Sequence, residues 1–173
     1  MIAQTSIPCR HGAWRCQRGS AAVEFAIFLL PLLLLAFGIV EYGRAIYNYN
    51  TLVKSVRASV RLLSSQSPDN EAYPALQANA RCLAVHGNVD CLGPTLLPNL
   101  SVVQIKICDR QTWSDCKESD QDSFRSVPTG MGTIHLVSVR VQGYQFPFIG
   151  LPLVTTTPTM TFGPIEAVMR QAG

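Results

Sequence analysis

The chain has 173 residues and a formal net charge of +3, from 14 basic and 11 acidic residues. Three of the basic residues, Arg10, Arg15 and Arg18, precede residue 20, so the other 11 balance the 11 acidic residues and the rest of the chain is formally neutral. This neutrality gives no electrostatic reason to expect a nucleic-acid-binding protein. About 108 residues follow residue 65, enough for one small domain.

An apolar run follows the three arginines. It extends from Ser20 to Val40 and contains one charged residue, Glu24. As a helix with ~1.5 Å rise per residue, the run would be about 31 Å long, enough to span a bilayer core of ~30 Å. Because the positive charges precede it, we expect a cytoplasmic amino terminus and an outer carboxy-terminal region.

This run has three interpretations. A cleaved secretory signal has a shorter apolar core of about 7–15 residues and an A-x-A-like site, whereas this run ends in Gly-Ile-Val-Glu-Tyr-Gly. A plain membrane anchor is the second interpretation, in which the carboxylate of Glu24 reaches water at the interface. The third gives Glu24 a function, since a charge inside a bilayer costs on the order of 3 kcal/mol or more.

The residues around Glu24 resemble a known processing site. The segment reads Arg18-Gly19-Ser20-Ala21-Ala22-Val23-Glu24-Phe25. It resembles the processing site of type IV pilin-like proteins, in which a basic leader ends in Gly and Glu is the fifth residue of the mature chain. Further residues narrow the resemblance to the TadE-like family of the tight-adherence (Tad/Flp, type IVb) pilus: Pro31, Glu41, Gly43, Arg44, Arg57 and Arg61. The sequence departs from the family's usual pattern at Ser59, where an acidic residue often occurs.

The resemblance implies a minor pilin or pseudopilin, not an enzyme, that supports assembly of a pilus used in adhesion and biofilm formation. It implies that a prepilin peptidase cuts the Gly19–Ser20 bond. The implied partners are other pilin subunits, an inner-membrane assembly platform and, indirectly, its ATPase. The expected product is a single-pass protein of the bacterial inner (cytoplasmic) membrane with a periplasmic outer domain. An uncleaved membrane-anchored accessory protein and a membrane-tethered binding module are the alternatives.

The helical pattern continues beyond the apolar run. Apolar residues recur at steps of three and four, typical of one helix face: Ala45, Ile46, Tyr49, Leu52, Val53, Val56, Val60 and Leu63. Lys54, Arg57 and Arg61 form a basic stripe, and the polar stretch from Ser64 ends the pattern. We therefore expect one helix over Ser20–Leu63, kinked at its internal proline. Its apolar face is expected to pack on the outer domain, on other subunits, or on both.

The region beyond residue 65 contains one helical pattern and two strand patterns. Apolar spacing predicts a helix over Glu71–Val85. Alternation predicts strands over Leu100–Cys108 and Thr133–Gly143, the second with one face buried. Residues 160–169 predict a last strand or short helix, and prolines predict a loop before it: Pro147, Pro152 and Pro158.

These elements favour an α+β, pilin-like fold in which a small antiparallel sheet packs on the long helix. The chain would then have three parts: a basic leader at 1–19, a transmembrane and amphipathic helix at 20–65, and a periplasmic α+β domain at 66–173.

Four of the six cysteines lie in the outer region, as expected for an oxidising compartment. Four cysteines allow three pairings, and we favour Cys82 with Cys91 and Cys108 with Cys116 because the members of each pair are near in sequence. A metal site of Cys82, His86 and Cys91 is the alternative, but it lacks a fourth ligand at an expected spacing. The other two cysteines lie in the leader, where we expect them to stay reduced.

The sequence gives little support for an enzymatic function. The three histidines, His11, His86 and His135, occur singly, and His135 lies within a strand pattern as a surface or hydrogen-bonded sheet residue. The chain contains no zinc-protease, nucleophile-elbow or phosphate-loop motif. The acidic residues between 115 and 122 do not match a calcium loop. We expect no cofactor and no metal.

Overall fold

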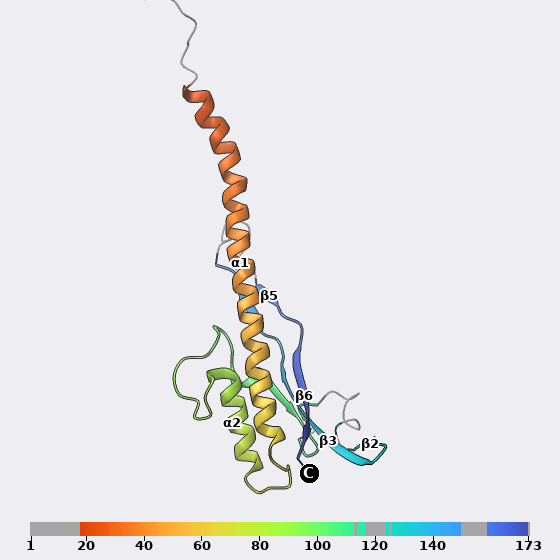
Figure 1. The fold of residues 1–173 in the computed structure, drawn as a ribbon. Coiled ribbons are helices and arrows are strands. Elements are labelled where there is room, and N and C mark those ends of the chain that lie inside the picture. The colour runs from red at the N-terminus through yellow and green to blue at the C-terminus, as the bar shows by residue number, and fades with distance from the viewer. Residues whose placement is uncertain (1–17, 113, 117–123, 125, 150–158, 173) are drawn as a thin grey trace, which may run out of the picture. The chain divides into compact units, whose positions relative to one another are not determined.

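The structure is a computed structural model of the chain and describes residues 18–112, 114–116, 124, 126–149 and 159–172. It divides into two units, Met1–Ile39 and Val40–Gly173. Two α-helices, one 3-10 helix and six strands follow one another along the described residues (Figure 1). The protein is therefore α+β, as expected from its sequence.

Helix α1, Arg18–Ser64, has 47 residues and confirms the long helix expected from the sequence. It contains Pro31, begins in the first unit and ends in the second. Its end is stabilised by the hydroxyl groups of Ser64 and Ser65, which donate to the carbonyl oxygens of Arg61 and Leu62. These bonds satisfy acceptors that a helix end leaves without a partner.

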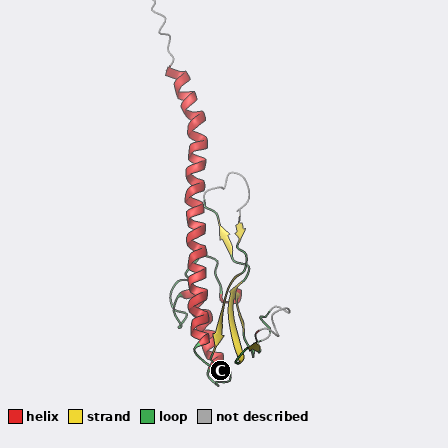
Figure 2. Cartoon of the chain, turned by 45° about the vertical axis from the view of Figure 1, so that its right-hand side comes forward, coloured by secondary structure: helices red, strands yellow, loops and turns green. Residues whose placement is uncertain are grey.

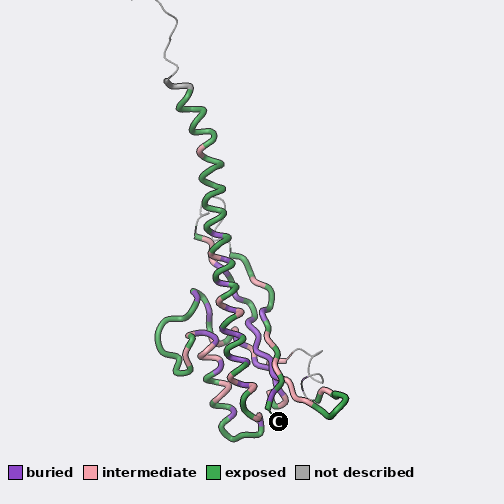
Figure 3. The backbone as a smooth tube through the Cα atoms, in the orientation of Figure 1, coloured by how far each residue is buried: buried purple, intermediate pink, exposed green. Residues whose placement is uncertain are grey.

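In the first unit, the described side chains of α1 are exposed. They run from Ala21 to Ile39 and are nearly all apolar, with Leu29 half-buried (Figure 3). By length and composition alone, α1 is long and apolar enough to cross a membrane. An apolar surface of this extent is unfavourable in water and marks a membrane or protein partner.

In the second unit, α1 is amphipathic. Leu52, Val56, Val60 and Leu63 are fully buried, whereas Lys54 on the basic stripe is exposed. The prediction that the apolar face packs on the outer domain is confirmed. Each buried residue is three or four positions from the next, the spacing that places side chains on one side of a helix.

Two serines share the buried face of α1. Ser55 and Ser59 are buried, and their hydroxyl groups donate to backbone oxygens one turn earlier, at Leu52 and Ser55. A small polar side chain can be buried in this way because its own helix supplies the acceptor.

Helix α2, Tyr73–His86, follows a tight turn and confirms the second predicted helix. Pro74 lies in its first turn, where the missing N–H would have no helical partner. Gly87 ends it with φ of 76°, a left-handed conformation, and a Cβ there would lie 3.1 Å from a methyl carbon of Leu96. This position therefore favours glycine.

The sheet is antiparallel and centred on β3, Gly132–Val141. β1, Ile105–Cys108, pairs with residues 138–141 of β3, and β6, Ile165–Gln171, pairs with residues 135–141. β2, Val127–Thr129, pairs with the start of β3. A separate hairpin joins β4, Gln145–Pro147, to β5, Thr159–Thr161 (Figure 2).

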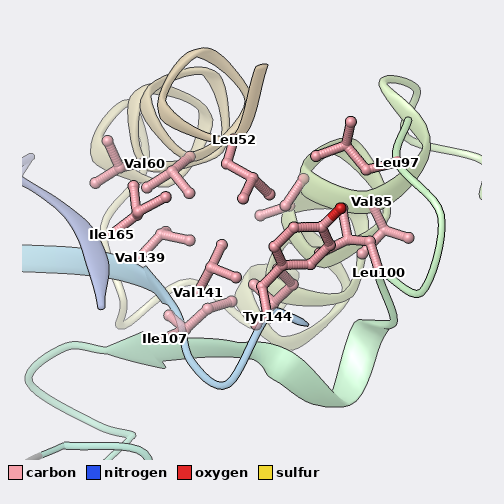
Figure 4. Packing of buried hydrophobic residues seen from close by; sticks show 14 of the residues in the cluster. Leu52, Val60, Val85, Leu97, Leu100, Ile107, Val139, Val141, Tyr144 and Ile165 are labelled. Atoms are coloured by element: carbon pink, nitrogen blue, oxygen red, sulfur yellow. The ribbon is translucent and has the colours of Figure 1, made fainter. Parts of the chain in front are cut away.

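The core of the second unit lies between α1, α2 and the sheet. Figure 4 shows side chains from all three converging, among them Leu52 of α1, Val85 of α2 and Val139 of β3. Tyr144, between β3 and β4, extends the core toward the hairpin. The second half of α1 is thus an integral part of the outer domain's packing.

Three sequence-based expectations are corrected. The strand expected over Leu100–Cys108 begins only at Ile105, because the residues before it form the 3-10 helix η1, Val102–Gln104. The side chain of Gln104 accepts a hydrogen bond from the Ser101 N–H at the start of this helix. Pro147 ends strand β4 instead of lying in a loop. β3 is buried on both faces from Val137 to Val141, and the Arg140 guanidinium donates to the Asp115 carbonyl oxygen beyond β1. Pro152 and Pro158 lie outside the described residues.

Candidate functional site

The residues of the expected processing site lie at the start of α1. Gly19 and Ser20 are in its first turn, and Glu24 and Phe25 follow about one turn later, both exposed. Cleavage at Ser20 would therefore create an α-amino group one helical turn from the Glu24 carboxylate. The expected leader residues 1–17 lie outside the described residues.

Gly43 lies on an open part of α1. A Cβ added there, or at Gly38, would meet nothing within 4 Å. The packing of the described residues therefore does not require either glycine. Small residues on an apolar helix allow another helix to approach closely.

Glu41 forms the centre of a buried cluster at the start of the second unit. Its side chain is only 9% exposed. Oε2 lies 2.7 Å from the guanidinium of Arg44, one turn later, and Oε1 accepts a 3.2 Å hydrogen bond from the backbone N–H of Ile149. The Arg44 guanidinium also lies 5.3 Å from the ring centroid of Phe146 in β4. Two expected motif residues, Glu41 and Arg44, are thus brought together.

This arrangement connects α1 to the β4–β5 hairpin. Both carboxylate oxygens of Glu41 have a partner, so the buried charge is satisfied. The cation–π contact of Arg44 with Phe146 adds an interaction of about 0.5–1 kcal/mol. The cluster, which we call the exit clip, consists of Glu41, Arg44, Phe146 and Ile149.

Aromatic rings extend the exit clip along α1. Phe162, just after β5, lies 6.0 Å from Tyr49 of α1 and 5.6 Å from Tyr144, measured between ring centroids. Phe146 and Phe148 pack edge to face at 5.1 Å. Such pairs stabilise by about 0.5–1.5 kcal/mol beyond the area they bury, so the hairpin is held on α1 by several contacts.

A second polar cluster surrounds Asp109, which follows β1 and is fully buried. Its Oδ2 accepts from the Tyr73 hydroxyl at 2.9 Å and from Gln77 at 2.8 Å. Its Oδ1 accepts from the backbone N–H groups of Gln111 and Thr112. Four donors therefore compensate the burial of this carboxylate, and the cluster joins α2 to the sheet.

Titration of two residues reflects these surroundings. Burial raises the pKa of Tyr73 well above its ordinary value, and the negative charge of Asp109 raises it further. The hydrogen bond from Arg110 lowers the pKa of the exposed Asp69 carboxyl. Arg110 also contacts the Nε2 atom of His135 at 3.2 Å, so His135 serves as a hydrogen-bonded sheet residue.

Both local cysteine pairs are disulfides. Cys82–Cys91 and Cys108–Cys116 have Cα–Cα distances of 4.8 and 4.9 Å. The nearby His86 places its Nδ1 atom 3.0 Å from a backbone carbonyl oxygen. The thiols needed for the alternative metal site are thus consumed, and the described residues contain no cluster of metal-binding side chains.

The basic stripe faces solvent. Lys54, Arg57 and Arg61 are exposed. The ion pairs formed among the described residues use other cations, those of Arg44, Arg81, Lys106 and Arg110. Arg57 and Arg61 therefore lie on the solvent-exposed surface of the second unit.

Sequence reasoning missed Asp109 and the hairpin side of the exit clip. A local signal for Asp109 was present in the sequence. An Asp directly after a strand, with Thr112 three residues later, favours a turn in which the carboxylate accepts backbone N–H groups. Ile149 had no such signal, because it contributes a backbone N–H and lies 108 positions from Glu41.

Comparison with known families agrees with the resemblance seen in the sequence. Residues 19–61 match the family model described as TadE-like protein. The match ends within α1 and includes the expected processing site, Glu41, Arg44, Arg57 and Arg61. No curated protein and no solved structure matches the chain. Over these residues, which lie on the long amino-terminal helix, the chain is similar to TadE-like proteins.

Proposed function

We propose that the chain is a minor pilin or pseudopilin that supports assembly of a Tad/Flp-type pilus. The observation that carries this proposal is the TadE-like match over 19–61, which falls on one helix. The apolar first part of that helix is exposed, and its second part is buried against a sheet. A membrane anchor that continues into a packed outer domain suits a subunit that waits in a bilayer for assembly.

The apolar run of α1 inserts in the bacterial inner membrane on this proposal. Arg10, Arg15 and Arg18 keep the amino terminus cytoplasmic, so the outer domain is periplasmic. The two disulfides support this, since such bonds persist in an oxidising compartment. The three proposed parts are the leader 1–19, the helix 20–65 and the outer domain 66–173.

A prepilin peptidase then removes the leader between Gly19 and Ser20. The new α-amino group and the carboxylate of Glu24 in a neighbouring subunit attract each other in the low dielectric of the membrane. Since both charges also lose hydration there, their pairing selects a helix register more than it adds stability. Glu24 thus specifies how the subunit meets its partner pilins.

The remaining partners act on the assembled pilins. An inner-membrane platform receives the processed subunits, and an ATPase drives the platform from the cytoplasm. Pili built with this subunit serve adhesion and biofilm formation. The role proposed for the chain is structural, and it needs neither a metal nor a cofactor.

Deletion and complementation test the proposed function. Cells that lack the chain should lose Tad-type pili and surface adhesion, and the intact chain should restore both. The chain should also remain with inner-membrane vesicles after an alkaline carbonate wash. Normal piliation without the chain, or its recovery as a soluble periplasmic protein, would contradict the proposal.

A further inference from the structure

We propose that the outer domain makes a second contact with the membrane, next to the point where α1 leaves it. Ile149 of the hairpin, together with Tyr42 and Ile46 of α1, lies in the headgroup region of the periplasmic leaflet. This inference rests on the proposed insertion of α1 in the inner membrane, and its partner is the lipid bilayer itself.

Chain connectivity places Ile149 near the bilayer. Glu41 directly follows Val40, the last residue of the apolar run, so its backbone is within about 2 Å of the end of the span along the helix axis. Ile149 donates its N–H to the Glu41 side chain, and therefore lies at a similar depth. The interfacial layer on each side of a bilayer is about 5–8 Å thick, which includes this position.

The chemistry of the surface fits that layer. Ile149 is 70% exposed, Tyr42 69% and Ile46 44%. Tyr42 and Ile46 are one helical turn apart, so they share a side of α1. Tyrosine is enriched at membrane interfaces because its ring is apolar and its hydroxyl group is polar. Apolar side chains beside it gain by leaving water.

The exit clip removes the main electrostatic obstacle to this contact. An unpaired carboxylate at the membrane surface would favour water, but Glu41 is buried with both oxygens hydrogen-bonded or paired. Arg44 is held against Glu41 and over the Phe146 ring. The hairpin therefore presents Ile149 to the lipid without exposing a free charge. The following segment, 150–158, lies outside the described residues and is no part of this surface.

Fluorescence quenching in the full-length chain tests the inference. Cys9 and Cys16 are replaced by serine, and single cysteines are introduced by Ile149→Cys, Met131→Cys or Phe28→Cys for labelling with an environment-sensitive nitrobenzoxadiazole dye. The disulfide-bonded cysteines do not react with the dye. Replacing Ile149 keeps its bond to Glu41, because that bond uses the backbone N–H. Met131, fully exposed in the β2–β3 turn, is the matched control.

Each chain is reconstituted in phosphatidylethanolamine–phosphatidylglycerol vesicles that contain lipids with a nitroxide near the headgroup or deep in the acyl chain. The Ile149 label should show blue-shifted emission and stronger quenching by the shallow nitroxide, whereas the Met131 label should show neither. If the Phe28 label is quenched by the deep nitroxide but Ile149 behaves like Met131, the second contact is refuted and the membrane anchor stands. If the Phe28 label is not quenched either, the proposed insertion itself fails.

Discussion

Ile149 donates its backbone N–H to Oε1 of Glu41, a residue 108 positions earlier in the chain, over 3.2 Å. The other oxygen of the same carboxylate is paired with Arg44. The Glu-Tyr-Gly-Arg sequence at the end of the apolar run thus has a structural explanation. Its acidic and basic residues are spaced by one helical turn, and together they fix the hairpin to α1.

Replacing Glu41 by alanine should lower the free energy of unfolding by about 1–3 kcal/mol, because Arg44 and the Ile149 N–H each lose a partner. Urea unfolding of the full-length chain in detergent micelles, followed by near-ultraviolet circular dichroism, measures this change. Glu71→Ala is the control, since Glu71 is exposed on the turn before α2. Equal stability of the two variants would show that the exit clip contributes little.

An acidic residue at position 59 should not be tolerated by this outer domain. Ser59 is fully buried in α1, and its hydroxyl group already has an acceptor within the helix. Ser59→Glu should destabilise the domain by about 3 kcal/mol or more, because an unpaired carboxylate would be buried. The matched variant Ala58→Glu places the same charge on the adjacent exposed position and should change stability by less than about 0.5 kcal/mol. Similar unfolding midpoints for the two would contradict the packing of α1.

Tyr73 should make the domain sensitive to alkali. Its pKa in the folded chain is raised by burial, so the stability that its protonated form contributes is fully present below about pH 10. Above that pH the Tyr73 phenol ionises in the unfolded chain but stays protonated in the folded chain, so the free energy of unfolding falls as the pH rises. Tyr73→Phe should lower stability near pH 7 by about 1–3 kcal/mol, since Asp109 loses a donor.

Urea midpoints measured between neutral pH and pH 11 check this dependence. The difference between wild type and Tyr73→Phe should shrink above pH 10. Tyr47→Phe, at an exposed position of α1, should keep the wild-type profile. A constant difference across the whole range would rule out the role assigned to Tyr73.

Glu24→Gln should impair pilus assembly without impairing membrane insertion. Removing a charge eases entry into the membrane, so the variant should still insert and still be processed. It should nevertheless co-purify poorly with partner pilins and form few pili, because the neutral amide has no negative charge to attract an ammonium group. Pull-down of partner subunits and counting of pili measure both effects. Undiminished assembly would identify Glu24 as an ordinary residue at the membrane interface.

Much of the fold could be predicted because it is encoded by local periodicity. The 3.6-residue spacing of apolar residues in α1 and α2, and the polar stretch after Ser64, define elements that the structure confirms. The short strand β1 was overpredicted, because alternation alone does not show that Ser101 and Gln104 favour a 3-10 turn. Burial of both faces of β3 was missed for a related reason, since alternation does not show that Arg140 donates to the Asp115 carbonyl oxygen beyond β1.

The candidate site, like the fold, could be predicted from the sequence only in part. Glu41 and Arg44 were singled out only as motif residues of the TadE-like resemblance, and the structure shows that they pair within one helix turn. Their contacts with Phe146 and Ile149 required the structure, since nothing in the spacing of residues so far apart specifies a meeting point. The buried Asp109 cluster likewise joins α2, β1 and the end of β6, whose Gln171 donates to the Tyr73 hydroxyl.

Intact mass of the chain recovered from the membrane tests the central claim most directly. A processed pilin-like subunit should begin at Ser20, and Gly19→Val should remain at full length, because only a small residue lets the backbone approach the peptidase closely. Gly43→Val is the control with the same change at an open position of α1, and it should be cut normally. A wild-type chain that retains residues 1–19, or a Gly19→Val chain that still begins at Ser20, would contradict the account.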